Sequence, residues 1–444
     1  MRIQLSDHFT YGKLIKFTLP SIASAIFSSV YSLVDSFFVS NFAGKTSFAA
    51  INLISPVLMI FGLVGVVFGS GGTALVAKTY GEGDKERANS YFSLFVLFAF
   101  FVGILLSFAG IIFAPQIAAL LGAEGALLKD CIAYARIIWI ALPFYLLQIM
   151  FNSFFVVAEK PKLALAVTVA AGLTNVVLDA ILVLLLPTEF KLIGAAIATA
   201  VAQAVGGIAP LFYFLRKNSS ILRLGKTRFD GRALLKASAN GSSQFMASIS
   251  SSVVGLLYNA QLMKYAGENG IAAYGAVMSI STFFVMMFSG FATGVAPVIG
   301  YHNGAKNQPE LKGVIRKCLT LIAVCGIATA AIAELLATPL VSIYVGYDAE
   351  LLKFTVSGFR IFAPSFVFIG FGFFTASFFT ALNDGLTAAV ISFLRTFIFQ
   401  CGAILLFPLL FDMNGIWLSY VFAEVMSFVL GVSFILAKRR KFGY

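Results

Sequence analysis

Charged residues are scarce in this sequence. Lys, Arg, Asp and Glu make up 11% of the 444 residues and hydrophobic residues make up 60%, with a mean hydropathy of +0.95. Soluble domains carry about 25% charged residues, so this composition excludes an ordinary soluble domain. Apolar runs long enough to cross about 30 Å of hydrocarbon recur along the whole chain. We therefore predict a polytopic integral membrane protein.

Cysteine and histidine are also rare, which limits the chemistry that the chain can perform. The two histidines, His8 and His302, fall in a terminal segment and a predicted loop, and no HExxH, CxxC or Ser/His couple occurs. These absences argue against a metal centre, a membrane-embedded enzyme and any bound cofactor. The four cysteines fall in or beside apolar runs, where we expect buried, inert thiols: Cys131, Cys318, Cys325 and Cys401.

The apolar runs divide into twelve predicted membrane-spanning helices. They are about twice as long as a barrel strand and do not alternate, which excludes a transmembrane β-barrel. The predicted helices cover residues 14–40, 47–77, 89–114, 130–157, 162–186, 192–216, 233–265, 271–303, 314–337, 351–382, 386–411 and 414–437.

The net charge of +12 is concentrated in short loops on one side of the predicted bundle. With twelve helices, 23 Lys and Arg residues fall on the side of the two termini and 5 on the other side. Cytoplasmic loops carry an excess of Lys and Arg, so we expect both termini in the cytoplasm and the protein in the inner membrane of a prokaryote. The same distribution argues against a nucleic-acid partner.

The chain contains an internal repeat. FAG at 42–44 matches YAG at 265–267, and GAAIATAVAQ from Gly194 matches GIWLSYVFAE from Gly415. We predict two pseudo-symmetric six-helix bundles: an N-terminal lobe over 1–216, a cytoplasmic linker over 217–232 and a C-terminal lobe over 233–444. Paired halves of this kind are typical of transporters, with the substrate path between them.

A few acidic residues fall well inside the predicted helices, where ionised groups are costly and usually functional. Asp35, Asp179 and Glu424 are the clearest, with Glu334 nearer to a helix end. Counted from the helix ends at 1.5 Å per residue, Asp35, Asp179 and Thr199 differ in depth by only about 3 Å. We therefore expect the first two acids to lie close together in the N-terminal lobe.

Asn175 joins this group because it precedes Asp179 by four residues and so shares its helix face. Two carboxylates, an amide and a hydroxyl offer only oxygen ligands, which suit a hard cation. They equally suit protons, because burial and a second acid raise the pKa of a carboxyl group. Asp35, Asn175, Asp179 and Thr199 are thus our candidate site for Na⁺ or H⁺.

The second half of the repeat does not reproduce this group. At an offset of 223 residues Asp35 corresponds to Tyr258, and at 221 residues Glu424 corresponds to Gln203. The coupling chemistry should therefore lie in one lobe only. For Glu424 we favour a structural ion pair with Arg395, one helix earlier.

At the level of motifs the chain resembles the multidrug and toxic compound extrusion (MATE) transporters over essentially its full length. The resemblance rests on the order and spacing of LPSIASAIFSSVYSLVDSFFVS, GVVFGSGGTALVAKTYGEGD, NVVLDAILV and GAAIATAVAQ. It is closest to the prokaryotic branch with its essential acids in the N-terminal lobe. The acids of the other branch are missing from helices 7 and 8, which argues against a second cation site there.

The resemblance implies a V-shaped pair of bundles that exports hydrophobic, often cationic drugs in exchange for H⁺ or Na⁺. It assigns cation coupling to Asp35, Asn175, Asp179 and Thr199, and places Tyr134 of the fourth helix in the same polar cluster. We add Gln203 as a candidate for this surrounding polar network. The resemblance also implies drug-like small molecules and the lipid bilayer as partners, and we expect a monomer. The 48 Phe residues and several Met residues offer adaptable apolar surface for such substrates.

Two other functions compete with this interpretation. Flippases for lipid-linked or peptide-like products share the two-lobe plan, but they often have extra helices or a strongly cationic cavity. An ion channel normally needs a ring of subunits or a filter loop, and the sequence contains no such loop. A secondary antiporter is the function that we predict, with the flippase as the alternative.

Overall fold

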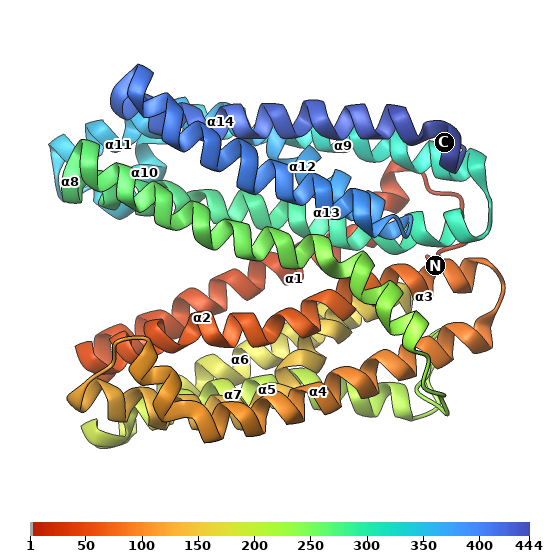
Figure 1. Cartoon of the computed structure of the whole chain (residues 1–444), viewed down its shortest axis with the longest axis horizontal. Helices are drawn as coiled ribbons and strands as arrows, with labels where there is room; N and C mark the ends of the chain where they lie inside the picture. The colour runs from red at the N-terminus through yellow and green to blue at the C-terminus, as the bar shows by residue number, and fades with distance from the viewer. Residues whose placement is uncertain (1–2) are drawn as a thin grey trace. The chain divides into compact units, whose positions relative to one another are not determined.

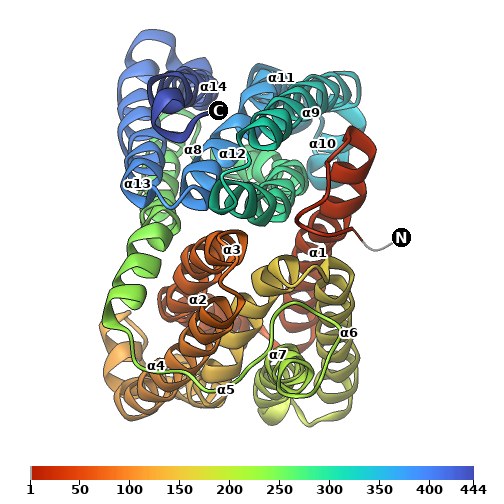
Figure 2. The same ribbon diagram turned by 90° about the vertical axis from the view of Figure 1, so that its right-hand side faces the viewer.

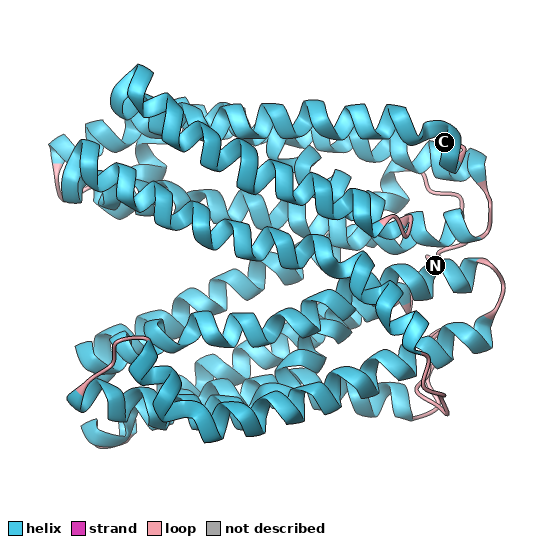
Figure 3. Ribbon diagram, in the orientation of Figure 1, coloured by secondary structure: helices cyan, strands magenta, loops and turns pink. Residues whose placement is uncertain are grey.

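The computed structural model describes residues 3–444, and within them every regular element is a helix (Figures 1 and 3). The first half contains α1 (Tyr11–Phe38), α2 (Lys45–Val67), α3 (Thr73–Gly81), α4 (Lys85–Leu120), α5 (Gly125–Val157), α6 (Pro161–Leu185) and α7 (Lys191–Leu215). The second half contains α8 (Gly231–Gly304), α9 (Gln308–Leu335), α10 (Ala337–Val345), α11 (Ala349–Phe362), α12 (Phe366–Ala381), α13 (Gly385–Phe393) and α14 (Cys401–Phe442). Short π-helices are η1 (Val39–Ala43), η2 (Phe68–Gly72) and η5 (Leu394–Gln400), and short 3₁₀-helices are η3 (Thr188–Phe190) and η4 (Ala363–Ser365).

Ten helical segments of the described chain are long and apolar enough to cross a membrane. Two of them contain a break: Gly267 in α8 has φ 57° and ψ −145°, and Asp412 in α14 has φ 49° and ψ −134°. Neither conformation continues a helix. Counting the helices on either side of each break gives twelve, and both breaks fall between helices that the sequence predicts. The predicted all-helical membrane fold is confirmed.

The repeat inferred from the sequence is visible in the backbone. Gly44 and Gly267, the glycines of the FAG and YAG motifs, both have positive φ, at 94° and 57°. Positive φ is readily tolerated only by glycine, so these motifs form the same kind of turn after the first helix of each half. The next helices also end at matched glycines, since α3 ends at Gly81 and α8 at Gly304.

The chain folds as two compact units. The N-terminal unit comprises residues 23–238, and the C-terminal unit comprises residues 3–22 together with residues 239–444. Each of α1 and α8 is therefore shared along its length by both units. The start of α1, which the sequence-based division placed in the lobe of residues 1–216, groups here with the second half of the chain.

Helix α5 is the centre of the N-terminal unit, in contact with α2, α4, α6 and α7 (Figure 1). It meets α7 closely because Gly207 has no side chain: a Cβ atom there would lie 2.5 Å from the carbonyl oxygen of Phe144. At one end of this unit Phe92 packs against Phe154 and Phe214, with ring centroids 4.8 and 4.9 Å apart.

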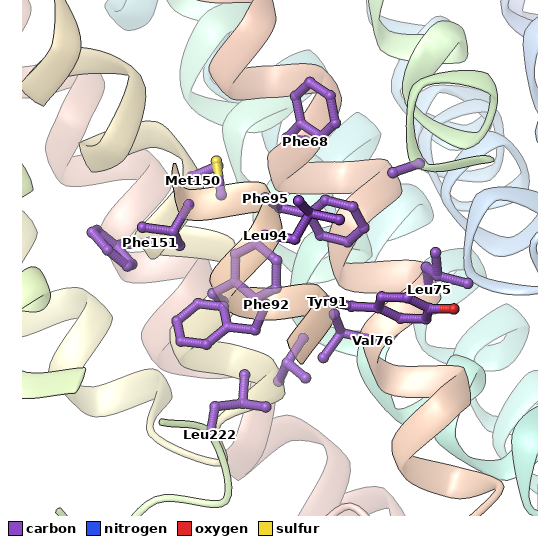
Figure 4. Close-up of a cluster of buried hydrophobic side chains, with 14 of the residues drawn as sticks. Phe68, Leu75, Val76, Tyr91, Phe92, Leu94, Phe95, Met150, Phe151 and Leu222 are labelled. Atoms are coloured by element: carbon purple, nitrogen blue, oxygen red, sulfur yellow. The ribbon is translucent and has the colours of Figure 1, made fainter. Parts of the chain in front are cut away.

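These rings belong to a large cluster of buried apolar side chains, part of which Figure 4 shows. The cluster draws on α3, α4, α5 and α7, and includes Leu222 from the connection between α7 and α8. Ala233, Leu234 and Ala237 at the start of α8 are buried in the same cluster. The connection and the first turns of α8 are thus fixed to the N-terminal unit.

In the C-terminal unit α12 contacts α9, α13 and α14. The end of α14 is held by Asp384, in the turn before α13: its Oδ2 lies 2.5 Å from Lys438 Nζ and 3.7 Å from Lys441 Nζ. Lys438 also donates to the hydroxyl of Thr387. Burial alone would raise the pKa of Asp384, but the hydrogen bonds from Lys438 and Thr387 and the two lysine charges outweigh it and hold the pKa below its usual value.

Because the pKa of Asp384 is lowered on folding, its carboxylate stabilises the protein above its unfolded pKa of about 3.9, and this stabilisation is lost as pH falls through the lowered folded value. We expect Asp384→Asn to reduce the free energy of unfolding at pH 7 by about 1–3 kcal/mol, the cost of leaving a buried charged group unpaired. Thermal unfolding in detergent from pH 7 to pH 3 measures this, and the difference from the unmodified protein should shrink below about pH 4.

Asp348→Asn is the matched control, since Asp348 caps α11 by accepting from the backbone N–H groups of Glu350 and Leu351. Asn caps a helix as well as Asp does, so stability should be unchanged. An Asp384→Asn effect that stays constant down to pH 3 would contradict the assignment.

The cysteines differ from expectation at one position. Cys131, Cys318 and Cys401 are buried, as predicted, but Cys325 is exposed on α9. The prediction failed there because an apolar run does not reveal which face of a membrane helix turns away from its neighbours.

Candidate cation-coupling site

Asp35 on α1 and Asp179 on α6 lie together in the N-terminal unit, within hydrogen-bonding reach of each other. The two helices meet closely where Gly172 faces Phe27 and Tyr31: a Cβ atom at Gly172 would lie 2.6 Å from the ring of Phe27. Asp35 is one turn beyond Tyr31 and Asp179 two turns beyond Gly172. The missing side chain at Gly172 thus allows the two acids to approach.

Asn175 and Thr199 extend the group from α6 to α7. Asn175 Nδ2 donates a long hydrogen bond of 3.5 Å to Thr199 Oγ1, and Thr199 Oγ1 donates to the carbonyl oxygen of Ala195 at 3.1 Å. Asn175 also lies beside both acids. The structure therefore brings together all four residues that the sequence selected as a candidate site.

The group has a surplus of buried oxygen atoms. Asp179 is 0% exposed and Asn175 is 2% exposed. Among the described residues no donor reaches Oδ1 of Asp35, Oδ1 of Asn175 or either carboxylate oxygen of Asp179. A contact between two carboxyl groups is favourable only if they share a proton, and a buried acceptor without a donor is costly. A proton or a small cation is the chemical species that would satisfy these atoms.

The two residues assigned to a surrounding network lie in the same unit. Tyr134 on α5 is 5% exposed and lies near both acids. Gln203, one turn beyond Thr199 on α7, is 7% exposed, and its Oε1 has no donor among the described residues. Sequence reasoning missed Tyr31, which lies beside Asp35 on the same face of α1. Its spacing of four residues from Asp35 is the signal that could have identified it.

The C-terminal unit contains the ion pair between Arg395 and Glu424. Arg395 Nη2 and Nε lie 2.9 and 3.3 Å from Glu424 Oε1, and the guanidinium lies 4.6 Å from the centroid of Phe373. Gly372 makes room for it, because a Cβ atom there would lie 2.8 Å from Arg395 Cζ. Glu424 is 0% exposed, and its Oε2 has no donor among the described residues.

The counterpart of Asp35 forms a different structure. The hydroxyl of Tyr258 is 2.8 Å from Ser419 Oγ, and its ring stacks on Tyr274 with centroids 5.1 Å apart. This position therefore carries a neutral, hydrogen-bonded pair. Glu334, the remaining acid, forms an ion pair of 3.4 Å with Arg360 in which both side chains are about half exposed.

Comparison with known proteins gives consistent matches. The MatE family model matches residues 20–181 and 244–402, one stretch in each half of the repeat. "Multidrug export protein MepA" of Staphylococcus saprophyticus is 25% identical over 405 residues, which cover 91% of this chain and 87% of that protein.

Two solved structures show the same fold. An outward-facing multidrug resistance MATE family transporter of the MOP superfamily has a TM-score of 0.91 at 21% identity and covers 98% of this chain and 97% of its own. A MOP superfamily transporter from Pyrococcus furiosus, described as having a binding pocket of reverse polarity that suggests a different function, has a TM-score of 0.89 at 20% identity. The two chains are each covered to 98% in that second comparison.

Proposed function

Since the chain belongs to the MatE family of multi-pass membrane transporters, we propose that it is a multidrug efflux antiporter that exchanges hydrophobic, often cationic compounds for H⁺ or Na⁺. The observation that carries the proposal is the pair of neighbouring acids, half-buried Asp35 and buried Asp179, with their unpartnered oxygen atoms. The MepA relative is named as a multidrug export protein. The abundant Phe and Met side chains suit adaptable apolar contacts with such substrates.

The acids would work by changing their net charge. Two buried carboxylates close together cannot both remain ionised without a large cost, so they take up one proton or one cation as a unit. Release of that ion restores the cost and favours a conformation in which water or a cationic substrate reaches the acids. Such an ion-dependent preference between two conformations is what antiport requires.

Helix α1 offers a route by which this change reaches the rest of the chain. Asp35 lies in the part of α1 that belongs to the N-terminal unit, whereas residues 11–22 of the same helix belong to the C-terminal unit. Pro20 lies within α1, close to the boundary between these two parts. Proline removes a backbone hydrogen bond and allows a helix to bend. We propose that neutralisation of Asp35 changes the course of α1.

The proposal is tested by efflux of ethidium from proteoliposomes carrying either an imposed pH gradient or an imposed Na⁺ gradient, never both. We expect saturable, gradient-driven ethidium movement with one of the two ions and no single-channel current. The ion that drives it identifies the coupling ion. Absence of ethidium movement driven by either ion, in folded protein, would contradict the proposal and favour the flippase alternative, with lipid-linked substrates as the next test.

We also propose that both termini lie in the cytoplasm. Protease access to the C-terminus, measured in parallel with efflux, tests this orientation.

A further inference from the structure

A second polar region of the N-terminal unit lies at the end where α3 finishes and α4 and α8 begin. It is a cavity of about 570 Å³. Four cationic and two acidic side chains line it: Lys78, Arg87, Arg232, Lys236, Glu82 and Asp230. None of these residues belongs to the candidate cation-coupling site, and their excess charge has the opposite sign.

The two acids are already engaged. Glu82 Oε1 lies 3.8 Å from Lys78 Nζ, one turn away on the same segment. Asp230 Oδ1 accepts a hydrogen bond of 3.0 Å from the backbone N–H of Ala233 and so caps the start of α8. Neither carboxylate is within ion-pair distance of the cations of α4 and α8.

Three of the cations therefore have no anionic partner. Arg87 Nε donates to the hydroxyl of Tyr91 at 2.8 Å, and its guanidinium lies 5.3 Å from the centroid of that ring. In the part of the chain that the structure describes, no carboxylate lies within 4 Å of the charged nitrogens of Arg87, Arg232 or Lys236. The cavity is thus lined by cations of α4 and α8 that no carboxylate of the described chain pairs with.

The connection between α7 and α8 holds the cations of α4 and α8 in place. This segment crosses the ends of α5 and α4 in Figure 2, where it is drawn in yellow-green. The backbone N–H of Arg223 donates to Asn89 Oδ1 at 2.7 Å, that of Gly225 donates to Ser93 Oγ at 3.0 Å, and Thr227 Oγ1 donates to the carbonyl oxygen of Ser90 at 2.8 Å. Together with the buried start of α8, these bonds hold Arg232 and Lys236 at the same cavity as Arg87.

Two helix N-termini lie at the same place, each capped by an aspartate carboxylate. Helix α4 begins at Lys85, where Asp84 accepts from the N–H of Arg87, and α8 begins at Gly231. The N-terminal end of a helix carries a partial positive charge that favours anions. Beside the cations of α8, Phe229 and Leu235 are 81% and 73% exposed, which provides apolar surface next to the charges.

We propose that this cavity binds a phosphate group, presented either by the headgroup of an anionic lipid or by a soluble phosphorylated compound. Guanidinium and ammonium groups converging from separate elements match the several oxygen atoms of a phosphate. The volume exceeds that of a single phosphate and accommodates a headgroup. The inference does not depend on the proposed transport function.

The test measures binding of a fluorescent short-chain phosphatidylglycerol to the full-length protein in neutral detergent. Phosphatidylcholine with the same chains is the reference, because its choline cancels the phosphate charge. We expect Arg232→Gln/Lys236→Gln to weaken phosphatidylglycerol binding by about 30-fold, from the usual contribution of two basic residues to binding of anionic lipid. Both side chains are exposed, so the variant should keep the unmodified melting temperature.

Arg216→Gln/Lys217→Gln is the matched control, because it removes the same charge at the other end of the connection between α7 and α8, outside the cavity. It should bind like the unmodified protein. Inorganic pyrophosphate distinguishes the two ligand sources: lipid binding without competition assigns a lipid headgroup, and binding of pyrophosphate itself assigns a soluble phosphate compound. Equal weakening in both double variants, or binding of neither phosphatidylglycerol nor pyrophosphate, would overturn the proposal.

Discussion

We expect Asp179→Asn to abolish gradient-driven efflux while leaving the protein folded. Asn has nearly the same shape as Asp but neither titrates nor carries a charge, so it cannot take up and release an ion. The substitution also removes the need for a shared proton with Asp35, so folding should not suffer. The measurement is ethidium efflux from proteoliposomes under the driving gradient, together with the melting temperature in detergent. The gradient-driven component should fall to the level of liposomes without a gradient.

Asp35→Asn should give the same result, because we propose that the two acids act as one titrating unit. Glu334→Gln is the matched control: it removes an intramembrane carboxylate from the C-terminal unit, where the exposed ion pair with Arg360 contributes little. Efflux in this control should be unchanged. Full gradient-driven efflux in either Asp variant would remove the pair from the coupling mechanism.

The candidate site could be predicted because a carboxylate inside an apolar run is visible without any tertiary information. Asp35 and Asp179 can be identified because an ionised group inside the membrane is energetically costly and therefore rare. Counting residues from the helix ends gives their depth in the membrane. The contact that joins them could not be predicted in this way. It depends on Gly172 facing Phe27 and Tyr31 of α1. The sequence contains 39 glycines, and nothing in it distinguishes a glycine that packs against another helix from the rest.

The helices were predictable for a similar reason, and their internal irregularities were not. The length of an apolar run identifies a membrane-spanning helix. The turns at Gly44 and Gly267 end such runs at glycines, which permit positive φ. The π-helices η1, just after Asp35, and η5, which contains Arg395, left no comparable pattern. Segments of this kind are frequent at functional sites, and both lie beside an intramembrane charge. The π-helical conformation of these segments is set by packing in the folded protein.

The two halves of the repeat show how one fold can hold different chemistry. At matched positions the first half has Asp35 and Gln203, and the second half has Tyr258 and Glu424. In the first half the acid has a second acid as neighbour, whereas in the second half the acid has an arginine. A paired acid and base neutralise each other permanently, which suits a structural role.

We expect Glu424→Gln to lower the free energy of unfolding by about 3–5 kcal/mol, because it leaves Arg395 buried without a counter-charge. The side chains of Arg395 and Glu424 are 13% and 0% exposed, so water cannot replace the lost carboxylate. The double variant Arg395→Met/Glu424→Met should recover most of this loss, since well-packed apolar residues often replace a buried ion pair without cost. Thermal unfolding of the two variants and the unmodified protein in detergent measures both effects.

Transport provides the decisive readout for the same variants. If the pair is structural, the double variant should retain gradient-driven ethidium efflux, because the acids that we propose to titrate, Asp35 and Asp179, lie in the N-terminal unit. A double variant that is stable but uncoupled would instead show that Glu424 takes part in ion exchange. Oε2 of Glu424, which has no donor among the described residues, would then be the atom that accepts the ion. The stability of one variant and the activity of the other thus separate a neutralised pair from a second titrating site.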